Sequence, residues 1–267
     1  MGGKPGKAGT ETDHVRAKKH LGQHFLKDKR IAAAIVEALK APDCDSVLEV
    51  GPGMGVLTHF LAERNLPALR VVEIDRESVD YLKQNLGGRL EIIEGDFLEL
   101  DLRLLGGRIA VIGNFPYNIS SQIFFKILEN RGLVTEVVGM LQKEVAERIC
   151  SGPGSRVYGI LSVLLRAWYD IEYLFTVSEH VFSPPPKVKS AVIRLTRNNI
   201  QSLGCDEKLF VSVVKRCFNQ RRKMIRNPIR ELVRPDAEEI PLLTQRAEQL
   251  SVRQFVELTN WVDANKR

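Results

Sequence analysis

From residue 31 onward, short apolar strands alternate with helices, and this alternation constrains the fold more than any other feature. Strands joined by helices in this way require right-handed crossovers, which place neighbouring strands parallel to one another. The predicted strands are 46–50, 69–74, 90–94, 109–113 and 135–141, and the predicted helices are 31–39, 56–64, 78–86, 121–128 and 142–150. This part of the chain therefore predicts a mostly parallel sheet.

The rest of the chain departs from this alternation. Residues 171–177 and 191–196 read as two strands with little helix between them, which predicts an antiparallel pair at one edge of the sheet. Beyond Asp206 the pattern is entirely helical. The predicted helices there are 207–218, 221–231, which Pro228 would kink or break, and 252–263.

We therefore predict an α/β fold with a Rossmann-like, mostly parallel sheet, an antiparallel edge and a small all-α C-terminal domain. The predicted boundaries are 1–17 for a disordered basic arm, 18–203 for the sheet domain and 204–267 for the helical domain. The arm is rich in Gly, Lys and Thr and poor in apolar residues, a composition that cannot bury a core.

Charge is unevenly distributed along the chain, whose formal net charge is +6. Residues 1–30 carry eight Lys and Arg against three Asp and Glu, and residues 187–230 carry twelve against two. The remainder is therefore acidic. The basic segments are either solvated charged faces or a surface for nucleic-acid phosphates, and charge alone leaves both interpretations open.

Several classes of protein are disfavoured by what the sequence lacks. No apolar run reaches the roughly 18 residues that a bilayer crossing needs, and the N-terminal segment has no apolar stretch typical of a secretory signal. Neither the histidines nor the cysteines show metal-ligand spacing. The cysteines are Cys44, Cys150, Cys205 and Cys217. We expect a cytoplasmic protein with no metal site, no disulfide framework and no membrane segment.

The first predicted strand ends in a glycine-rich turn, residues 49–55, of sequence EVGPGMG. Glycines such as Gly51 and Gly53 let the backbone turn tightly and approach a ligand closely. The spacing is G-x-G-x-G, and Val56 breaks the dinucleotide fingerprint G-x-G-x-x-G. The turn therefore suits an uncharged ribose and amino-acid moiety better than a pyrophosphate.

Carboxylates follow the next two strands. Glu73, with Asp75 close behind, can accept the hydroxyls of a ribose, and Asp96 can receive an adenine amino group while Phe97 packs near the ring. Singly, each acid could be a solvated residue at a strand end. In this order, the glycine turn and the two acids form the motif series of class I methyltransferases, which implies S-adenosylmethionine as cofactor.

The fourth strand leads into Asn114-Phe115-Pro116-Tyr117, which resembles the catalytic tetrapeptide of amino-directed methyltransferases. The lone pair of an adenine amino group is delocalised into the ring. The Asn114 side-chain oxygen and the Phe115 carbonyl can accept its N–H groups and free that lone pair for attack. Pro116 stiffens the turn, and Tyr117 offers a ring for stacking on the base.

Chemistry on a ring amine requires the base to leave its stack, so a second aromatic contact is expected. Phe182 precedes three prolines that would hold its loop rigid and project the ring outward. The alternative is a proline-rich edge loop with Phe182 in the core.

Five segments, recurring in one order, resemble the ribosomal small-subunit RNA adenine dimethyltransferases, the bacterial kasugamycin-sensitivity enzymes. These segments are 19–26 (KHLGQHFL), 49–53 (EVGPG), 114–120 (NFPYNIS), 182–188 (FSPPPKV) and 218–227 (FNQRRKMIRN). The resemblance covers roughly residues 18–262. It implies N6,N6-dimethylation of two adjacent adenines in the 3′-terminal hairpin loop of 16S rRNA, late in assembly of the small ribosomal subunit.

The resemblance also implies cofactor contacts at His24, Leu26, Gly51, Glu73, Asp96 and Asn114. The family commonly has Asn at the position of His24, which leaves a side-chain contact there open. It commonly has Leu at the position of Phe115, where the backbone carbonyl would act.

Three alternatives remain: a 23S rRNA enzyme of the macrolide-resistance type, a mainly non-catalytic assembly factor, and a DNA adenine methyltransferase. The basic segment Arg221, Arg222, Lys223 and Arg226 favours contacts with rRNA in an immature small subunit. Some of these arginines could instead tie the helical domain to the acidic middle of the chain. We expect the protein to be a monomer.

Overall fold

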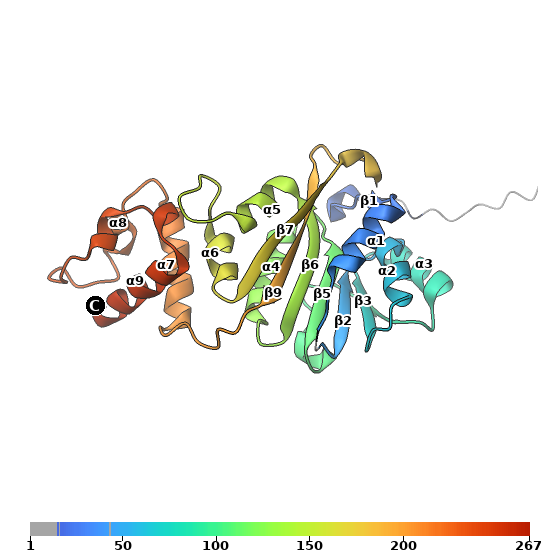
Figure 1. Ribbon diagram of the computed structural model, residues 1–267, viewed down its shortest axis with the longest axis horizontal. Helices are drawn as coiled ribbons and strands as arrows, with labels where there is room; N and C mark the ends of the chain where they lie inside the picture. Colours follow the sequence, from blue (N-terminus) through green and yellow to red (C-terminus); the bar gives the residue numbers. More distant parts are fainter. Residues whose placement is uncertain (1–14, 16, 43) are drawn as a thin grey trace, which may run out of the picture.

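The computed structural model describes residues 15, 17–42 and 44–267, and it centres on a seven-stranded sheet of order β4-β3-β2-β5-β6-β9-β7 (Figure 1). The strands are β2 (Ser46–Val50), β3 (Leu69–Glu73), β4 (Glu91–Glu94), β5 (Ile109–Asn114), β6 (Val134–Gln142), β7 (Tyr169–Val177) and β9 (Ser190–Arg197). The first five are parallel, whereas β9 runs antiparallel to both β6 and β7. The predicted parallel sheet and its antiparallel edge are confirmed.

Helices cover both faces of this sheet. They are α1 (Lys29–Ala38), α2 (Val56–Ala62), α3 (Arg76–Leu86), α4 (Ser120–Glu129), α5 (Lys143–Cys150) and α6 (Ile160–Arg166). In β5, Ala110 and Ile112 pack in the core with α1 and α2, whereas Ile109 and Val111 pack in the core with α4 and α6. Burial on both faces explains why the strands are almost continuously apolar.

Helix α6 has no counterpart among the predicted elements. Residues 161–165 are all buried, because α6 lies between the sheet and the C-terminal helices. A helix that is apolar on every side lacks the 3.6-residue period by which an amphipathic helix is recognised.

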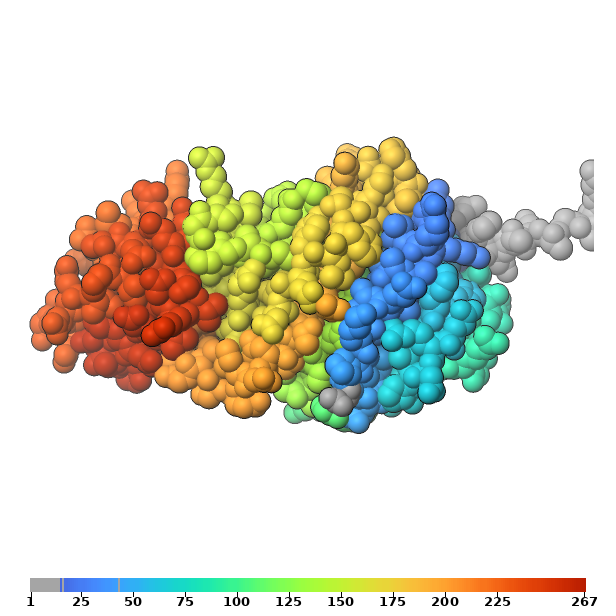
Figure 2. All heavy atoms as spheres, in the orientation of Figure 1, coloured from blue at the N-terminus to red at the C-terminus, as the bar shows by residue number. Residues whose placement is uncertain are grey.

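The C-terminal helices α7 (Glu207–Asn219), α8 (Arg226–Ile229) and α9 (Val252–Ala264) form one end of an elongated molecule (Figures 1 and 2). Helices α7 and α9 pack on α6, and their apolar residues continue one core from the sheet. The all-helical C-terminal part is confirmed, while the boundary at 203/204 stays a prediction. The basic arm predicted at 1–17 falls, apart from residues 15 and 17, outside the described residues.

The helix predicted over 221–231 is wrong, because only Arg226–Ile229 is helical. The Ile225 amide donates to the Gln245 carbonyl at 2.8 Å, and Met224 forms a β-bridge with Arg246. These pairings draw the backbone out of the helical path. On a continuous helix, Arg222 and Arg226 would share one face, with Lys223 beside them. Because the helix begins only at Arg226, this alignment is lost.

A short antiparallel pair joins β1 (Phe25–Leu26) to β8 (Phe182–Ser183), with Leu26 opposite Phe182. This pairing directs the Phe182 ring into the core, where the residue is 1% exposed. The prediction that Phe182 projects outward to stack on a target base is therefore wrong, and the alternative of a core residue holds.

Candidate active site

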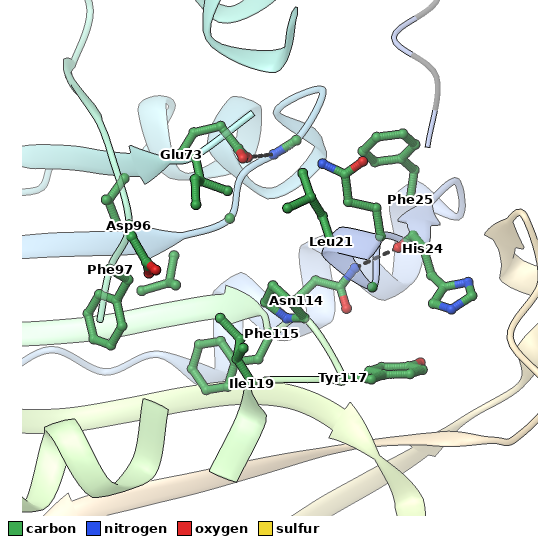
Figure 3. A pocket seen from close by; sticks show the side chains of 18 of the residues that line it. Leu21, His24, Phe25, Glu73, Asp96, Phe97, Asn114, Phe115, Tyr117 and Ile119 are labelled. Carbon is green, nitrogen blue, oxygen red and sulfur yellow. Dashed lines mark hydrogen bonds between the residues drawn. The ribbon is translucent and has the colours of Figure 1, made fainter. Parts of the chain in front are cut away.

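A pocket opens at the carboxyl ends of the central parallel strands, where ligands of open α/β sheets bind (Figure 3). Its hollow measures about 640 Å³ including the open mouth. The strand ends contribute Val50, Gly51, Gly53, Val72, Glu73, Ile74, Gly95, Asp96, Phe97, Asn114, Phe115, Pro116 and Tyr117, and residues 21–25 and Ile119 complete the wall. Among the described residues that line the pocket, none is Lys or Arg.

The glycine turn after β2 lies close to the N-terminal segment. A Cβ on Gly53, whose φ is +55°, would lie 2.8 Å from the Phe25 ring. Only glycine combines this backbone conformation with this close contact. Because Gly51 and Gly53 have no side chains, backbone atoms of this turn line the pocket directly.

Glu73, at the end of β3, holds the glycine turn in place. Its Oε2 accepts a hydrogen bond from the Gly53 amide at 3.0 Å, drawn as a dashed line in Figure 3, and its Oε1 accepts one from the Asp75 amide at 2.9 Å. Burial raises the pKa of this carboxyl above its ordinary value. Each oxygen keeps a second lone pair, so the carboxyl can still accept hydroxyl groups from a ligand.

Glu49, one strand away, is fully buried but does not line the pocket. The Thr58 hydroxyl donates to its Oε2 at 2.7 Å, and burial raises the pKa of Glu49 to about 8. The Glu49 carboxyl therefore has a partner inside the protein and not in the pocket, and with a pKa of about 8 it is largely protonated at neutral pH.

We predict a pH-dependent stability from Glu49. When the pKa of a carboxyl is higher in the folded state than in the unfolded state, its contribution to stability is complete at pH values below the unfolded-state pKa. This contribution is lost as the pH rises through the folded-state pKa. The melting temperature should therefore fall as the pH rises from 4.5 to about 8. Glu49→Gln should make that fall shallower, leaving the part due to Glu73. An identical slope in thermal melts of the variant and the wild type would contradict this account.

Asp96 and Phe97 lie at the side of the pocket away from His24 (Figure 3). Asp96 Oδ1 accepts from the Leu98 amide at 2.8 Å, which fixes the carboxylate and leaves Oδ2 available. Phe97 is almost fully buried and forms an apolar wall, with Lys126 Nζ 5.7 Å from its ring centre.

Asn114 is held by the N-terminal segment. Its Nδ2 donates to the His24 carbonyl at 2.9 Å (Figure 3), and its Oδ1 accepts no hydrogen bond within the described residues. The amide thus has a fixed orientation with a free acceptor. The neighbouring Phe115 is buried, with its ring against Phe124, and its amide donates to the Met140 carbonyl at 2.9 Å.

Tyr117 and His24 separate this pocket from a second hollow, which is lined by Ala17, Lys19, Gly22, Gln23, Gln142, Pro184, Pro185, Pro186, Lys187 and Val188. The two rings lie 5.2 Å apart, and His24 Nδ1 bonds the Pro184 carbonyl at 2.8 Å. The Tyr117 hydroxyl bonds Ser190 Oγ, and burial raises the pKa of Tyr117. Gly22, Gln23, His24 and Tyr117 line both hollows, so the two hollows adjoin at this wall of the pocket.

The sequence-based site residues fall into two groups. Those around the pocket are His24, Gly51, Gly53, Glu73, Asp96, Phe97, Asn114, Phe115, Pro116 and Tyr117. Leu26 does not line it, because its side chain packs in the core behind β1, and Phe182 lies in the same core. Sequence analysis missed nine further lining residues: Leu21, Gly22, Gln23, Phe25, Val50, Val72, Ile74, Gly95 and Ile119. All but Val72, Ile74 and Gly95 lie within the segments quoted above.

The basic C-terminal residues also divide. Arg221 pairs with Glu248 at 2.6 Å and donates to the Ser155 carbonyl at 3.3 Å, so it links two parts of the protein. Arg221 therefore has a structural contact, as in the alternative that some of these arginines tie parts of the chain together. Its acidic partner Glu248, however, lies in the C-terminal part and not in the acidic middle of the chain. Arg222, Lys223 and Arg226 are exposed.

The described residues contain no group of three or more His, Cys, Asp and Glu side chains that could hold a metal ion. None of the helices in this part of the chain is both long and apolar enough to cross a membrane.

The fold and pocket are those of a Rossmann-like methyltransferase. The structure is similar to a dimethyladenosine transferase from Plasmodium falciparum, with a TM-score of 0.76 and 24% identity, covering 90% of this chain and 98% of that one. It is also similar to the 23S rRNA methyltransferase ErmE, with a TM-score of 0.70 and 26% identity, covering 90% and 99% of the two chains.

Comparison with known sequences defines the family. Residues 14–264 match the model of the ribosomal RNA adenine dimethylases. The chain is 61% identical to ribosomal RNA small subunit methyltransferase A of Parabacteroides distasonis, over 92% of this chain and 93% of that protein. It is 58% identical to the protein of the same name from Bacteroides thetaiotaomicron, over 93% and 95%. The chain belongs to the ribosomal RNA adenine dimethylase family, and its activity is that of an rRNA adenine N6,N6-dimethyltransferase.

Proposed function

We propose that this enzyme transfers methyl groups from S-adenosylmethionine to N6 of two adjacent adenines in the 3′-terminal hairpin loop of 16S rRNA. We further propose that it acts as a cytoplasmic monomer on the immature small subunit. The observation that carries the proposal is the fixed Asn114 amide in the pocket wall, whose Oδ1 accepts no hydrogen bond within the described residues and whose Nδ2 is held by His24, a residue that lines both hollows.

The pocket lining fits S-adenosylmethionine. A wall with two carboxylates and no Lys or Arg suits a sulfonium cation and an uncharged ribose and disfavours a pyrophosphate. Glu73 would accept the ribose hydroxyls, Asp96 would accept the adenine amino group, and Phe97 and Ile74 would contact the ring. When bound, this cofactor supplies a methyl group activated by positive charge on sulfur.

Asn114 and Phe115 would act on the target amine. Asn114 Oδ1 and the Phe115 carbonyl accept its two N–H groups, which pulls the nitrogen toward tetrahedral geometry and localises its lone pair. The localised lone pair would then accept the methyl group that the bound cofactor supplies, and the amine would release its proton to water. A second transfer to the same nitrogen, which would then keep one N–H group for these acceptors, would give the dimethyl product.

The second hollow would receive the flipped adenosine. Tyr117 borders both hollows and presents its ring where a base must lie to reach Asn114. Because Phe182 is buried in the core, Tyr117 would provide the ring that stacks on the base. Pro184, Pro185 and Pro186, which line the second hollow, would contact the base from the side.

Arg222, Lys223 and Arg226 would bind rRNA phosphates outside the pocket. Two relatives at 58–61% identity are ribosomal RNA small subunit methyltransferases, whereas the 23S rRNA methyltransferase ErmE is only 26% identical, which supports a small-subunit substrate.

We expect Glu73→Ala to weaken cofactor binding about tenfold or more, because charge-assisted hydrogen bonds contribute roughly 1.5–3 kcal/mol. Calorimetric titration with S-adenosylmethionine measures this. Glu49→Gln is the matched control, since it alters a buried carboxyl beside the pocket that does not line it. A dissociation constant unchanged by Glu73→Ala would place the ribose elsewhere.

The proposed substrate is tested by tritiated methyl transfer to under-methylated small subunits, large subunits and DNA in parallel. We expect label in small-subunit rRNA and background counts in the other two. Label in the large subunit would favour the macrolide-resistance activity, and label in none, with the cofactor bound, would favour a non-catalytic assembly role.

A further inference from the structure

Residues 18–25, here called the N-terminal strap, cross the mouth of the cofactor pocket, and residues 21–25 line it. Leu21, His24 and Phe25 are labelled in Figure 3 beside Asn114. Since His24 supplies the carbonyl that orients Asn114, the position of the strap determines the position of the catalytic amide.

Asp75 contacts this strap in a way that helix capping does not explain. It is the N-cap residue of α3, yet its side chain makes no capping hydrogen bond. By contrast, Asp101 and Asp206, which are also N-cap residues, accept hydrogen bonds from backbone amides of the first turn. Within its own helix, Asp75 Oδ2 accepts only from the Ser78 hydroxyl, at 3.1 Å, in the part of the chain that the structure describes. The bond to a backbone amide that usually accounts for an aspartate at this position is therefore missing.

The Asp75 carboxylate instead binds two strap side chains distant in sequence. Its Oδ1 accepts from Lys18 Nζ at 2.5 Å, and its Oδ2 accepts from Gln23 Nε2 at 3.3 Å. Gln23 Oε1 in turn accepts from the Lys18 backbone amide at 2.8 Å, so the three groups close a ring of contacts. Asp75 is 3% exposed, which makes these charge-assisted bonds stronger than surface contacts.

Asp75 does not line the cofactor pocket, unlike its neighbours Glu73 and Ile74. Its connection to the reaction runs through the strap: Gln23 precedes His24, and the His24 carbonyl binds Asn114 Nδ2. We propose that Asp75 is a positioning residue for methyl transfer, which holds the strap through Lys18 and Gln23 and thereby orients Asn114. This inference rests on the catalytic role proposed above for Asn114.

The test compares Asp75→Asn with Asp101→Asn, which alters an N-cap aspartate paired with Arg103 outside the site. We expect Asp75→Asn to lower kcat at saturating cofactor and RNA about tenfold or more, since small misplacements of reacting groups carry such costs. KM for RNA should change by less than threefold. Amide hydrogen exchange of residues 18–25, measured without RNA, should accelerate at least tenfold in Asp75→Asn. Asp101→Asn should leave kcat and the exchange rate of residues 18–25 unchanged.

Lys18 provides the conservative series. Lys18→Arg should keep most of the rate, and Lys18→Gln should lower it. Combining Asp75→Asn with Lys18→Gln should cost less than the sum of the two single changes, because both remove the shared Lys18–Asp75 contact. An unaltered kcat in Asp75→Asn would overturn the proposal, as would a loss of melting temperature alone. Faster hydrogen exchange of the strap together with a normal kcat would show that the order of the strap does not affect methyl transfer, and this result would also contradict the proposal. If the wild-type protein showed slow exchange of the strap but no methyl transfer, the proposed function would be wrong, and not the contact between Asp75 and the strap.

Discussion

Replacing Asn114 with alanine should lower kcat for methyl transfer by about 10²- to 10³-fold, the typical cost of removing one preorganised polar contact to a transition state. The structure gives the reason: the His24 carbonyl holds Nδ2, so Oδ1 is already oriented before substrate arrives. An interaction used mainly in the transition state changes the rate more than the binding. RNA affinity should therefore remain within a few-fold of wild type in a filter-binding assay.

The control for this variant is Asn85→Ala, at an exposed asparagine of α3 whose amide bonds only the Tyr81 carbonyl of its own helix. It should leave kcat unchanged. An Asn114→Ala enzyme that kept more than half the wild-type rate would remove Asn114 from the chemistry.

Neutralising Arg222, Lys223 and Arg226 to Gln should weaken binding to under-methylated small subunits on the order of 100-fold near 0.15 M salt. Each lost phosphate contact lowers the log–log salt slope by about 0.7 to 0.9. The slope should therefore fall by roughly two to three units. Cofactor affinity should not change, because these side chains lie in the C-terminal part, at the far end of the molecule from the strap (Figure 2).

A matched variant separates this effect from net charge. Lys83, Arg103 and Arg108 are exposed cations of the sheet domain, and changing all three to Gln removes the same charge. This control should keep nearly the full salt slope. A normal slope in the Arg222, Lys223 and Arg226 variant, together with a lowered melting temperature, would assign these residues to the stability of the C-terminal part.

The elements that the sequence predicted well are those whose pattern is local. β2 was predicted at 46–50 and occupies Ser46–Val50, and the helix predicted at 252–263 occupies Val252–Ala264. Glu73, Asp96 and Asn114 follow from the same logic, since the carboxyl ends of parallel strands meet at one edge of the sheet.

The errors arise where distant segments determine the structure. Phe182 is buried because β8 pairs with β1, a contact between residues more than 150 positions apart. The helix predicted over 221–231 is interrupted because Ile225 bonds Gln245. The sequence shows only that Asp75 follows Glu73 at a strand end, and the folded structure shows that its carboxylate is occupied by Lys18, Gln23 and Ser78.

The most direct test of the central claim is mass spectrometry of nucleosides from rRNA, after under-methylated small subunits react with this enzyme and S-adenosylmethionine. We predict two N6,N6-dimethyladenosines per 16S rRNA, located in the 3′-terminal hairpin loop and formed about 10²- to 10³-fold more slowly when Asn114→Ala replaces the wild type. Methylation at another atom, in another region of the RNA, or at an equal rate with Asn114→Ala would contradict the account.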